Sequence, residues 1–380
     1  MTAQALIALK RFGLGQKSGQ LGEVAGDPRG FVARQLEGPS ENFIKTNLLT
    51  SAEIWIKQRS HAKNRRAAIK AGDSKKVDAM KRPKDYHDEI AAHLADAIGT
   101  NDPLLRRLGW FWTDHLCVSA KKSPMIRHLS GSYAREAIFP HILGNFREML
   151  HAAVLHPAML IYLDNYNSIG PNSKVGKKRN KGLNENLARE ILELHTLGVN
   201  GGYNQDDVVN FARALTGWTV WTLRKRGKAG TTRFHKGRHE PGSVTVLGKV
   251  YSQKGKKQAK AILDDLARHP STAKFIARKL VVHFVGDEAP QSLVDRIEDV
   301  FSKTDGDLRA IHQTLIDAPE SWDHPPSKFL PPLDMMVTTA RALDIDMSAK
   351  LIRRTLGVFG QEWWGPPSPA GWPSEDNAWM

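Results

Sequence analysis

Apolar residues recur at intervals of three and four positions through most of this chain, which is the spacing of amphipathic helices. Asp102-Pro103 pairs an N-cap acid with a proline at the first helical position, where a helix readily starts. One stripe then follows, made of Leu104, Leu108, Phe111, Trp112 and His115. Asn204 to Asp207 resembles a capping box, and Gly217 should stop its helix. The pattern predicts a mainly α, multi-helical protein.

The spacing of the apolar residues changes at Trp218, from a helical to a strand-like pattern. The runs WTVWTL, TTRF and SVTVLGKVY are rich in β-branched and aromatic residues, and glycine and basic residues separate them. They predict a β-hairpin or three-stranded β insert over 218–251. We therefore expect a single mainly α domain over 1–380, with four parts: helical 1–217, the β insert 218–251, helical 252–357 and a Trp/Pro-rich C-terminal segment 358–380.

The C-terminal segment should pack against something. Its last twenty residues hold four of the ten tryptophans, and large aromatic rings are unfavourable in water. We expect these rings to pack on the body of the protein or on a partner, rather than to stack on sugar or bases.

Composition excludes several classes of protein. A chain of 380 residues with 41% hydrophobic and 25% charged residues can bury a sizeable core, so a disordered chain is excluded. No apolar run approaches the roughly 18 residues of a transmembrane span, and the N-terminus lacks the features of a signal peptide. The single Cys117 excludes an intrachain disulfide and a thiolate zinc cluster. The compartment stays open.

The excess of basic charge is concentrated in four segments. These segments are residues 57–84, 174–181, 224–239 and 249–260. Together they carry a net charge of +26, so the rest of the chain carries a net charge of −11, which gives the total of +15. Such segments form a solvated surface or a face for an anionic partner, such as nucleic acid, phospholipid headgroups or acidic polysaccharide. A nucleic-acid partner rests on charge alone, since no recognition motif accompanies it.

The stretch GLNENLAREILELHTLG, residues 182–198, concentrates polar side chains on one predicted helix. At 100° per residue, Glu185, Arg189 and Glu193 share a polar arc with Asn186 and Glu190, while His195 lies on the apolar arc opposite. Asn184 is a good N-cap and Gly198 a natural C-cap. Two explanations stay open. Glu185–Arg189 and Arg189–Glu193 pairs stabilise a helix, whereas two nearby carboxylates, Glu190 and Glu193, can supply an acid and a base or bind a cation.

Two histidines are predicted to face inward from separate helices, His115 and His195. Each is explained by simple burial in the core. If the two meet, however, His235 or His239 with Glu240 on the β insert could supply further ligands for zinc, iron or manganese. No HExxH spacing supports such a metal site, and no GxSxG elbow or phosphate-binding glycine loop favours another chemistry.

The run NENLAREILELHTLGVNGGYNQDDVVNFARALTGW closely resembles the signature of a large bacterial family known only as domain of unknown function 1800. Further matches occur in order along nearly the whole chain: RFGLG, FWTDH, GNFREMLHAAVLHPAMLIYLDN, SIGPNS, RFHKGRHEPGSVTVLG, LARHPSTAKFIARKL and GQEWWGPPSPAGWP. The family name specifies no reaction. The resemblance does imply which residues occupy motif positions: Asn184, Glu185, Asn186, Arg189, Glu190, Glu193, His195, Gly198, Asp207, Arg213, Thr216, Gly217, Trp218, His115 and His239.

The resemblance carries three further expectations. Family members usually have aspartate where this chain has Glu240, and many extend beyond the GWP motif, so a C-terminal element is expected to be missing or replaced here. Many members look exported. Their genes often stand beside those of a family similar to sulfatases and alkaline phosphatases, which implies a neighbouring partner of that kind in an envelope or secreted pathway.

Three hypotheses about function follow. The first is a polar pocket on helix 184–198 that binds a divalent metal and supports hydrolysis, with Glu190, Glu193, His195 and Arg189 as catalytic groups and His115, His195, His239 and Glu190 as metal ligands. The second is a non-enzymatic binding or assembly protein whose polar arc only fixes helix packing. The third is nonspecific nucleic-acid binding through the basic segments.

Overall fold

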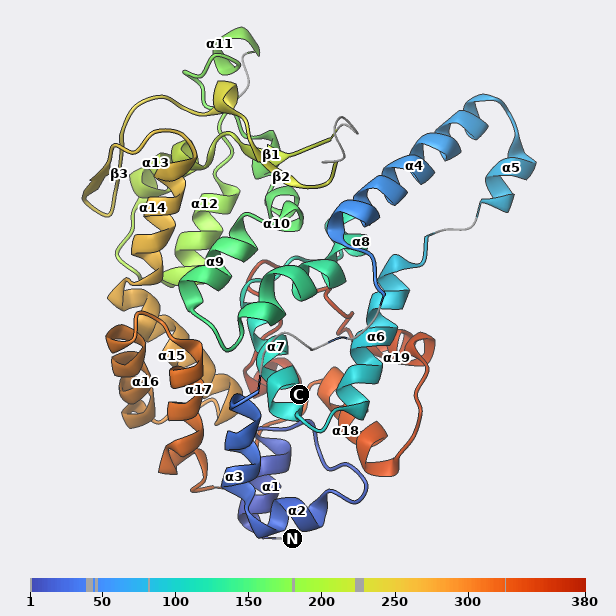
Figure 1. The fold of residues 1–380 in the computed structure, drawn as a ribbon, viewed down its shortest axis with the longest axis vertical. Helices are drawn as coiled ribbons and strands as arrows, with labels where there is room; N and C mark the ends of the chain where they lie inside the picture. Colours follow the sequence, from blue (N-terminus) through green and yellow to red (C-terminus); the bar gives the residue numbers. More distant parts are fainter. Residues whose placement is uncertain are drawn as a thin grey trace.

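A computed structural model describes residues 2–38, 44, 47–80, 83–179, 182–222, 229–324 and 326–380. Within these residues the protein is mainly α with two small β-sheets, as predicted (Figure 1). Four lysines and arginines of the predicted basic segment 224–239, at positions 224, 225, 226 and 228, lie outside the described residues.

The first half of the chain is helical up to the β insert. Its helices are α1 (Ala3–Lys10), α2 (Leu21–Gly26), α3 (Pro28–Ala33), α4 (Ser51–Lys70), α5 (Ser74–Ala79), α6 (Asp85–Gly99), α7 (Pro103–His115), α8 (Pro124–Tyr133), α9 (Phe146–Val154), α10 (Pro157–Tyr162), α11 (Gly176–Arg179), α12 (Asn186–Glu190) and α13 (Gln205–Leu215). After the insert come α14 (Lys256–Ala267), α15 (Pro270–Phe284), α16 (Gln291–Lys303), α17 (Leu308–Asp317), α18 (Pro332–Leu343) and α19 (Ala349–Val358).

Local signals determine several of these boundaries. The capping box is present at α13, where the Asn204 side chain accepts from the N–H of Asp207 (3.0 Å) and the Asp207 carboxylate accepts from the N–H of Asn204 (2.9 Å). Proline opens α7, as the Asp102-Pro103 pair predicts, and it also opens α10 and α15. His156 caps α10, because its Nδ1 accepts from the N–H of Ala158 (3.1 Å).

Two segments are wound more loosely than an α-helix. Ala134–Ile138 and Ile191–Thr196 are π-helical, and in the second the Thr196 hydroxyl donates to the carbonyl of Ile191 (2.6 Å). The regular helix predicted over 184–198 is therefore wrong in detail, since α12 ends at Glu190. A π-helical turn changes the angle per residue, so the 100° wheel does not apply beyond Glu190.

The described residues of the β insert form four short strands in two antiparallel pairs, rather than one sheet of two or three strands. β1 (Trp218–Val220) pairs with β2 (Thr232–Phe234), with Thr219 opposite Arg233. β3 (Val244–Val246) pairs with β4 (Lys249–Tyr251), and β3 packs on α13. Asp207 links the two elements, because its carboxylate also accepts from the N–H of Leu247 (2.7 Å).

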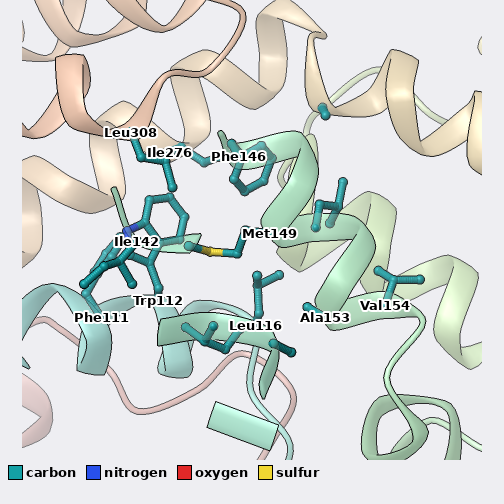
Figure 2. Packing of buried hydrophobic residues seen from close by; sticks show 14 of the residues in the cluster. Phe111, Trp112, Leu116, Ile142, Phe146, Met149, Ala153, Val154, Ile276 and Leu308 are labelled. Atoms are coloured by element: carbon teal, nitrogen blue, oxygen red, sulfur yellow. The ribbon is translucent and has the colours of Figure 1, made fainter. Parts of the chain in front are cut away.

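Trp112 stands in the middle of the main hydrophobic cluster (Figure 2). Its ring lies among side chains from α7, α9, α15 and α17, and its indole N–H donates to Nε2 of His312 (3.3 Å). A second cluster joins α6, α18 and α19 to Trp363 of the C-terminal segment. No described helix combines the length and the apolar character that crossing a membrane requires.

Candidate functional site

The polar arc of residues 184–198 is largely satisfied by its own neighbours. Arg189 donates to Glu185 (3.1 Å) and to Gln205 (3.0 Å), and Gln205 donates to Glu185 (2.9 Å). Glu193 accepts from the Tyr203 hydroxyl (3.3 Å). The expected N-cap is shifted, because α12 begins at Asn186, whose N–H donates to the side chain of Asn184 (3.0 Å). These contacts fix helix packing and leave Glu190 as the carboxylate to explain.

Glu190 is half-buried. Burial raises the pKa of its carboxyl group, and repulsion from Glu193 adds to this, while attraction to Arg189 opposes it. Its negative charge also contributes to the raised pKa values of Cys117 and Tyr162. Glu190 therefore interacts electrostatically with the segment that follows α7.

His115 and His195 are both buried, as predicted, and they lie against each other with ring centroids 6.5 Å apart. Nε2 of His115 contacts the backbone oxygen of His195 (3.1 Å), and Nδ1 of His115 contacts Nζ of Lys279 (3.3 Å). A neutral His115 that donates from Nε2 and accepts at Nδ1 satisfies both contacts. Both ring nitrogens of His115 are therefore occupied.

His195 is different. Its side chain is fully buried, and neither ring nitrogen has a hydrogen-bond partner among the described residues. Burial, and secondarily the charge of Lys279, lowers the pKa of His195 to about 3. The ring is therefore neutral at physiological pH, and an uncompensated polar ring costs stability.

The other expected metal ligand, His239, is engaged in the β insert. Its Nδ1 contacts the backbone oxygen of Thr216 (3.0 Å), and its ring packs on Phe234. The described part of the chain contains no group of three or more His, Cys, Asp or Glu side chains that could hold a metal ion. The arrangement thus gives no support to a metal centre of His115, His195, His239 and Glu190.

The remaining motif residues have structural partners. Asp207 caps α13 and holds the turn between β3 and β4. Arg213 donates to the side chain of Asn210 (3.0 Å) on its own helix. Trp218 in β1 packs on Phe234 of β2 and lies under Lys260. These contacts give Asp207, Arg213 and Trp218 structural roles in α13 and the β insert.

A cavity of about 90 Å³ opens between α7, α15 and the C-terminal segment. Aromatic side chains form much of its wall: Trp110, Phe111, Phe329, Trp363, Trp364, Trp372 and Trp379. Charged side chains line it from three helices: Arg107 and Asp114 from α7, Lys279 from α15, where His283 follows one turn later, and Asp334 from α18. Lys328 and Glu362 line it as well. Pockets with an aromatic wall and a few convergent polar groups are the usual form of a small-molecule site.

The environment of the cavity shifts the pKa values of Asp114 and Lys279 toward each other. Burial raises the pKa of Asp114 to about 7, although the charge of Lys279 and a hydrogen bond from the backbone N–H of Trp372 both oppose the rise. Burial likewise lowers the pKa of Lys279, against the attraction of Asp114. Partial removal from water therefore brings the proton affinities of an acid and a base closer together.

Sequence reasoning missed both residues. Asp114 lies beside the selected His115, but we treated FWTDH only as a motif. The apolar pattern of α15 favoured a core helix, although Lys279 and His283 at i and i+4 gave a signal of a shared polar face. Cys117 is buried, and its thiol contacts the carbonyl oxygen of Pro369 (3.3 Å).

The C-terminal segment closes one side of the cavity. The N–H of Ala120 donates to the carbonyl of Trp364 (2.6 Å), and the Ser119 hydroxyl donates to that of Pro366 (2.7 Å). Gly371 and Trp372 then pass directly over Asp114. The expectation that this tryptophan-rich segment packs on the body is confirmed.

Gly371 is predicted to be intolerant of substitution. Its φ is +85°, and a Cβ at this position would overlap the backbone oxygen of Asp114. We expect Gly371→Ala to lower the free energy of unfolding by about 2–4 kcal/mol, measured by urea denaturation. Gly360→Ala is the matched control, because Gly360 has φ +79° but open space around it, so it should lose only about 1 kcal/mol. Equal losses in the two variants would refute the close packing over Asp114.

The chain matches a family model described as "Protein of unknown function (DUF1800)" over residues 7–380. The protein belongs to the DUF1800 family. No curated protein and no solved structure matches it. The resemblance noted in the sequence is therefore confirmed, and the family description assigns no activity.

The cavity of this DUF1800 protein is built from three of the segments on which the resemblance was recognised. FWTDH supplies Asp114, LARHPSTAKFIARKL supplies Lys279, and GQEWWGPPSPAGWP supplies Trp372. These segments are far apart in the sequence and meet only in the fold.

Proposed function

We propose that this DUF1800 protein is a hydrolase-like enzyme whose centre is the cavity between α7, α15 and the C-terminal segment. The observation that carries the proposal is the placement of Asp114 and Lys279 in one aromatic-walled cavity, from two different helices. Asp114 is the proton donor, since its raised pKa keeps a substantial fraction protonated near neutral pH. Lys279 stabilises the carboxylate that forms when Asp114 gives up its proton.

The residues selected from the sequence act around this pair. His115 holds Nζ of Lys279 through its Nδ1, and its own position is fixed by the backbone of His195. The negative charge of Glu190 contributes to the raised pKa of the Cys117 thiol. In this proposal Glu193 and Arg189 keep the helix in place through Tyr203 and Glu185.

The test compares wild-type protein with Asp114→Asn on a panel of p-nitrophenyl esters, phosphates, sulfates and glycosides. General acid catalysis contributes about 10²- to 10⁴-fold to a rate, so the variant should lose at least 100-fold in kcat. Because the protonated form is the active one, the wild-type rate should fall as pH rises through about 7. Asp299→Asn is the control, since Asp299 is an exposed residue paired with Lys303.

Two results would contradict the proposal. One is a wild-type protein that hydrolyses no class of the panel, and the other is an Asp114→Asn variant that keeps the wild-type rate and pH profile.

The second candidate function is a binding or assembly protein. The mutual hydrogen bonds of Glu185, Arg189 and Gln205 favour it. Polar side chains that already bond to one another have a structural role that does not require a substrate. In this case the envelope pathway and the sulfatase- or phosphatase-like neighbour implied by the family resemblance supply the partner. Co-purification of such a neighbour together with an inactive wild-type panel would favour this function over the enzyme.

A further inference from the structure

Helices α4 and α5 together form an arm. Figure 1 shows α4 running away from the body, with α5 folded back at its tip. The base of α4 is anchored, because Ile54 and Trp55 are buried and Lys57 pairs with Asp85. Beyond this base most residues of the arm are exposed up to Ala79. The arm therefore offers a surface that the proposed enzyme centre does not use.

Four cations form a straight row on α4. Arg59, Lys63, Arg66 and Lys70 are spaced i, i+4, i+7 and i+11, which places them on one helical face. All four are exposed, and none has an ion-pair partner among the described residues. The row extends over about 16 Å at 1.5 Å per residue.

The charge of the arm is not balanced by its surroundings. Residues 57–76 carry eight lysines and arginines against a single carboxylate, Asp73. That carboxylate is used locally, since it accepts from the N–H of Lys76 (2.9 Å) and caps α5. Lys75 and Lys76 add two exposed charges near the tip.

A lipid surface fits this arm poorly. A helix that lies on a bilayer inserts an apolar face with large side chains. Within residues 51–80, all of which the structure describes, Ile69 is the one large apolar side chain that is mostly exposed, at 53%. An isolated isoleucine gives no such face, so the arm can act through charge only.

Duplex DNA fits the arm in both charge and shape. It carries one negative charge per about 1.7 Å of its axis, the kind of dense linear charge that a row of cations neutralises. Its major groove is about 12 Å wide and admits an α-helix, whose diameter is about 10–12 Å with side chains. The outer part of α4 stands clear of the rest of the ribbon (Figure 1).

We propose that the α4–α5 arm binds the phosphate backbone of duplex DNA without sequence preference, through the row Arg59, Lys63, Arg66 and Lys70. The arm is independent of the cavity, so either proposal can fail alone. Binding is driven by release of counterions, and it therefore weakens as salt rises.

The experiment measures binding of the full chain to two unrelated 20-base-pair DNA duplexes by fluorescence anisotropy at 50 and 200 mM salt. Four phosphate contacts predict that affinity falls about 100-fold between these concentrations. Lys63→Glu/Arg66→Glu/Lys70→Glu should weaken binding at least 10-fold at 50 mM salt and should reduce the salt dependence. The control is Lys254→Glu/Lys256→Glu/Lys257→Glu, which makes the same change in net charge at exposed positions away from the arm and should keep most of the affinity.

Circular dichroism of both variants shows whether α4 remains folded, and Arg59 is left in place because it packs over Trp55. Equal weakening by the arm variant and the control would overturn the proposal, since net charge alone would then explain binding. So would an affinity that salt does not change. Tighter binding to phosphatidylserine vesicles or to an acidic polysaccharide than to the duplexes would overturn it in favour of that partner.

Discussion

At pH 5 the protein should be close to unfolding, although it is stable at pH 7.5. His93, His195 and His312 are almost completely buried, and burial lowers the pKa of each to about 3. His115 is also buried, and its pKa lies well below the usual value. In the unfolded chain a histidine titrates near 6.5, so the unfolded state takes up protons first as pH falls.

Because the unfolded state binds more protons, acid lowers the stability of the folded state. The stability is fully present above pH 6.5 and is lost as pH falls from there toward 3. At pH 5 each of the three histidines with a pKa of about 3 costs about 2 kcal/mol, and together they approach the total stability of an ordinary domain. Asp114 acts in the opposite sense, because its raised pKa makes the folded state gain stability as pH falls from about 7. Burial also raises the pKa of Glu89 and Glu190, so these two carboxyl groups act in the same sense as Asp114 and offset part of the loss.

Urea denaturation at pH 7.5, 6.5, 5.5 and 5 measures this effect. His195→Leu is the informative variant, since both ring nitrogens lack a hydrogen-bond partner among the described residues and the contact of His115 is to the backbone of residue 195. We expect this variant to be more stable by about 1 kcal/mol at pH 7.5 and by more at pH 5. A pH dependence identical to that of the wild type would show that His195 does not titrate as described.

Arg341→Met should lower the free energy of unfolding by about 3–5 kcal/mol. Arg341 is fully buried, and its guanidinium donates to the carbonyl oxygens of Ala97 (3.0 Å), Ile98 (2.8 Å) and Thr100 (3.0 Å) at the end of α6. Its Nε also approaches the carbonyl of Gly15 (3.4 Å). Without the cation these carbonyls lose their donor in a region closed to water.

Thermal and urea unfolding of Arg341→Met measure the loss. Arg296→Met is the matched control, because Arg296 is exposed and its pair with Glu320 is at the surface, where such pairs contribute less than about 1 kcal/mol. A loss of less than 1 kcal/mol in Arg341→Met would mean that water replaces the guanidinium.

Local sequence was sufficient wherever the structure depends on neighbouring residues. The capping box of α13, the proline starts of α7, α10 and α15, and the bounds of α17 all follow from a few adjacent positions. The inward orientation of His115 also follows, because its place on an apolar stripe is a local property. His195 was placed inward correctly, but on a wheel that the π-helical turn invalidates.

The expected ligand set has no support in the described part of the structure, for a different reason. His239 was grouped with His115 and His195 by residue type, whereas its contacts tie it to Thr216 and Phe234 in the β insert. Sequence spacing does not tell how the insert folds back on the helices, so it does not tell which histidines meet.

The sequence by itself determined that this protein is mainly α and that it belongs to the DUF1800 family, whereas it left open whether the tryptophan-rich end packs on the body or on a partner. Apolar periodicity, caps and motif order are properties of the chain read in sequence. Only the tertiary structure decided that Asp114, Lys279 and Trp372 share one cavity, and that the basic segment around Arg66 stands out as an arm. The reason is physical: the pKa shifts of Asp114 and Lys279 arise from loss of water between segments far apart in the chain, and such burial exists only after the segments have packed together.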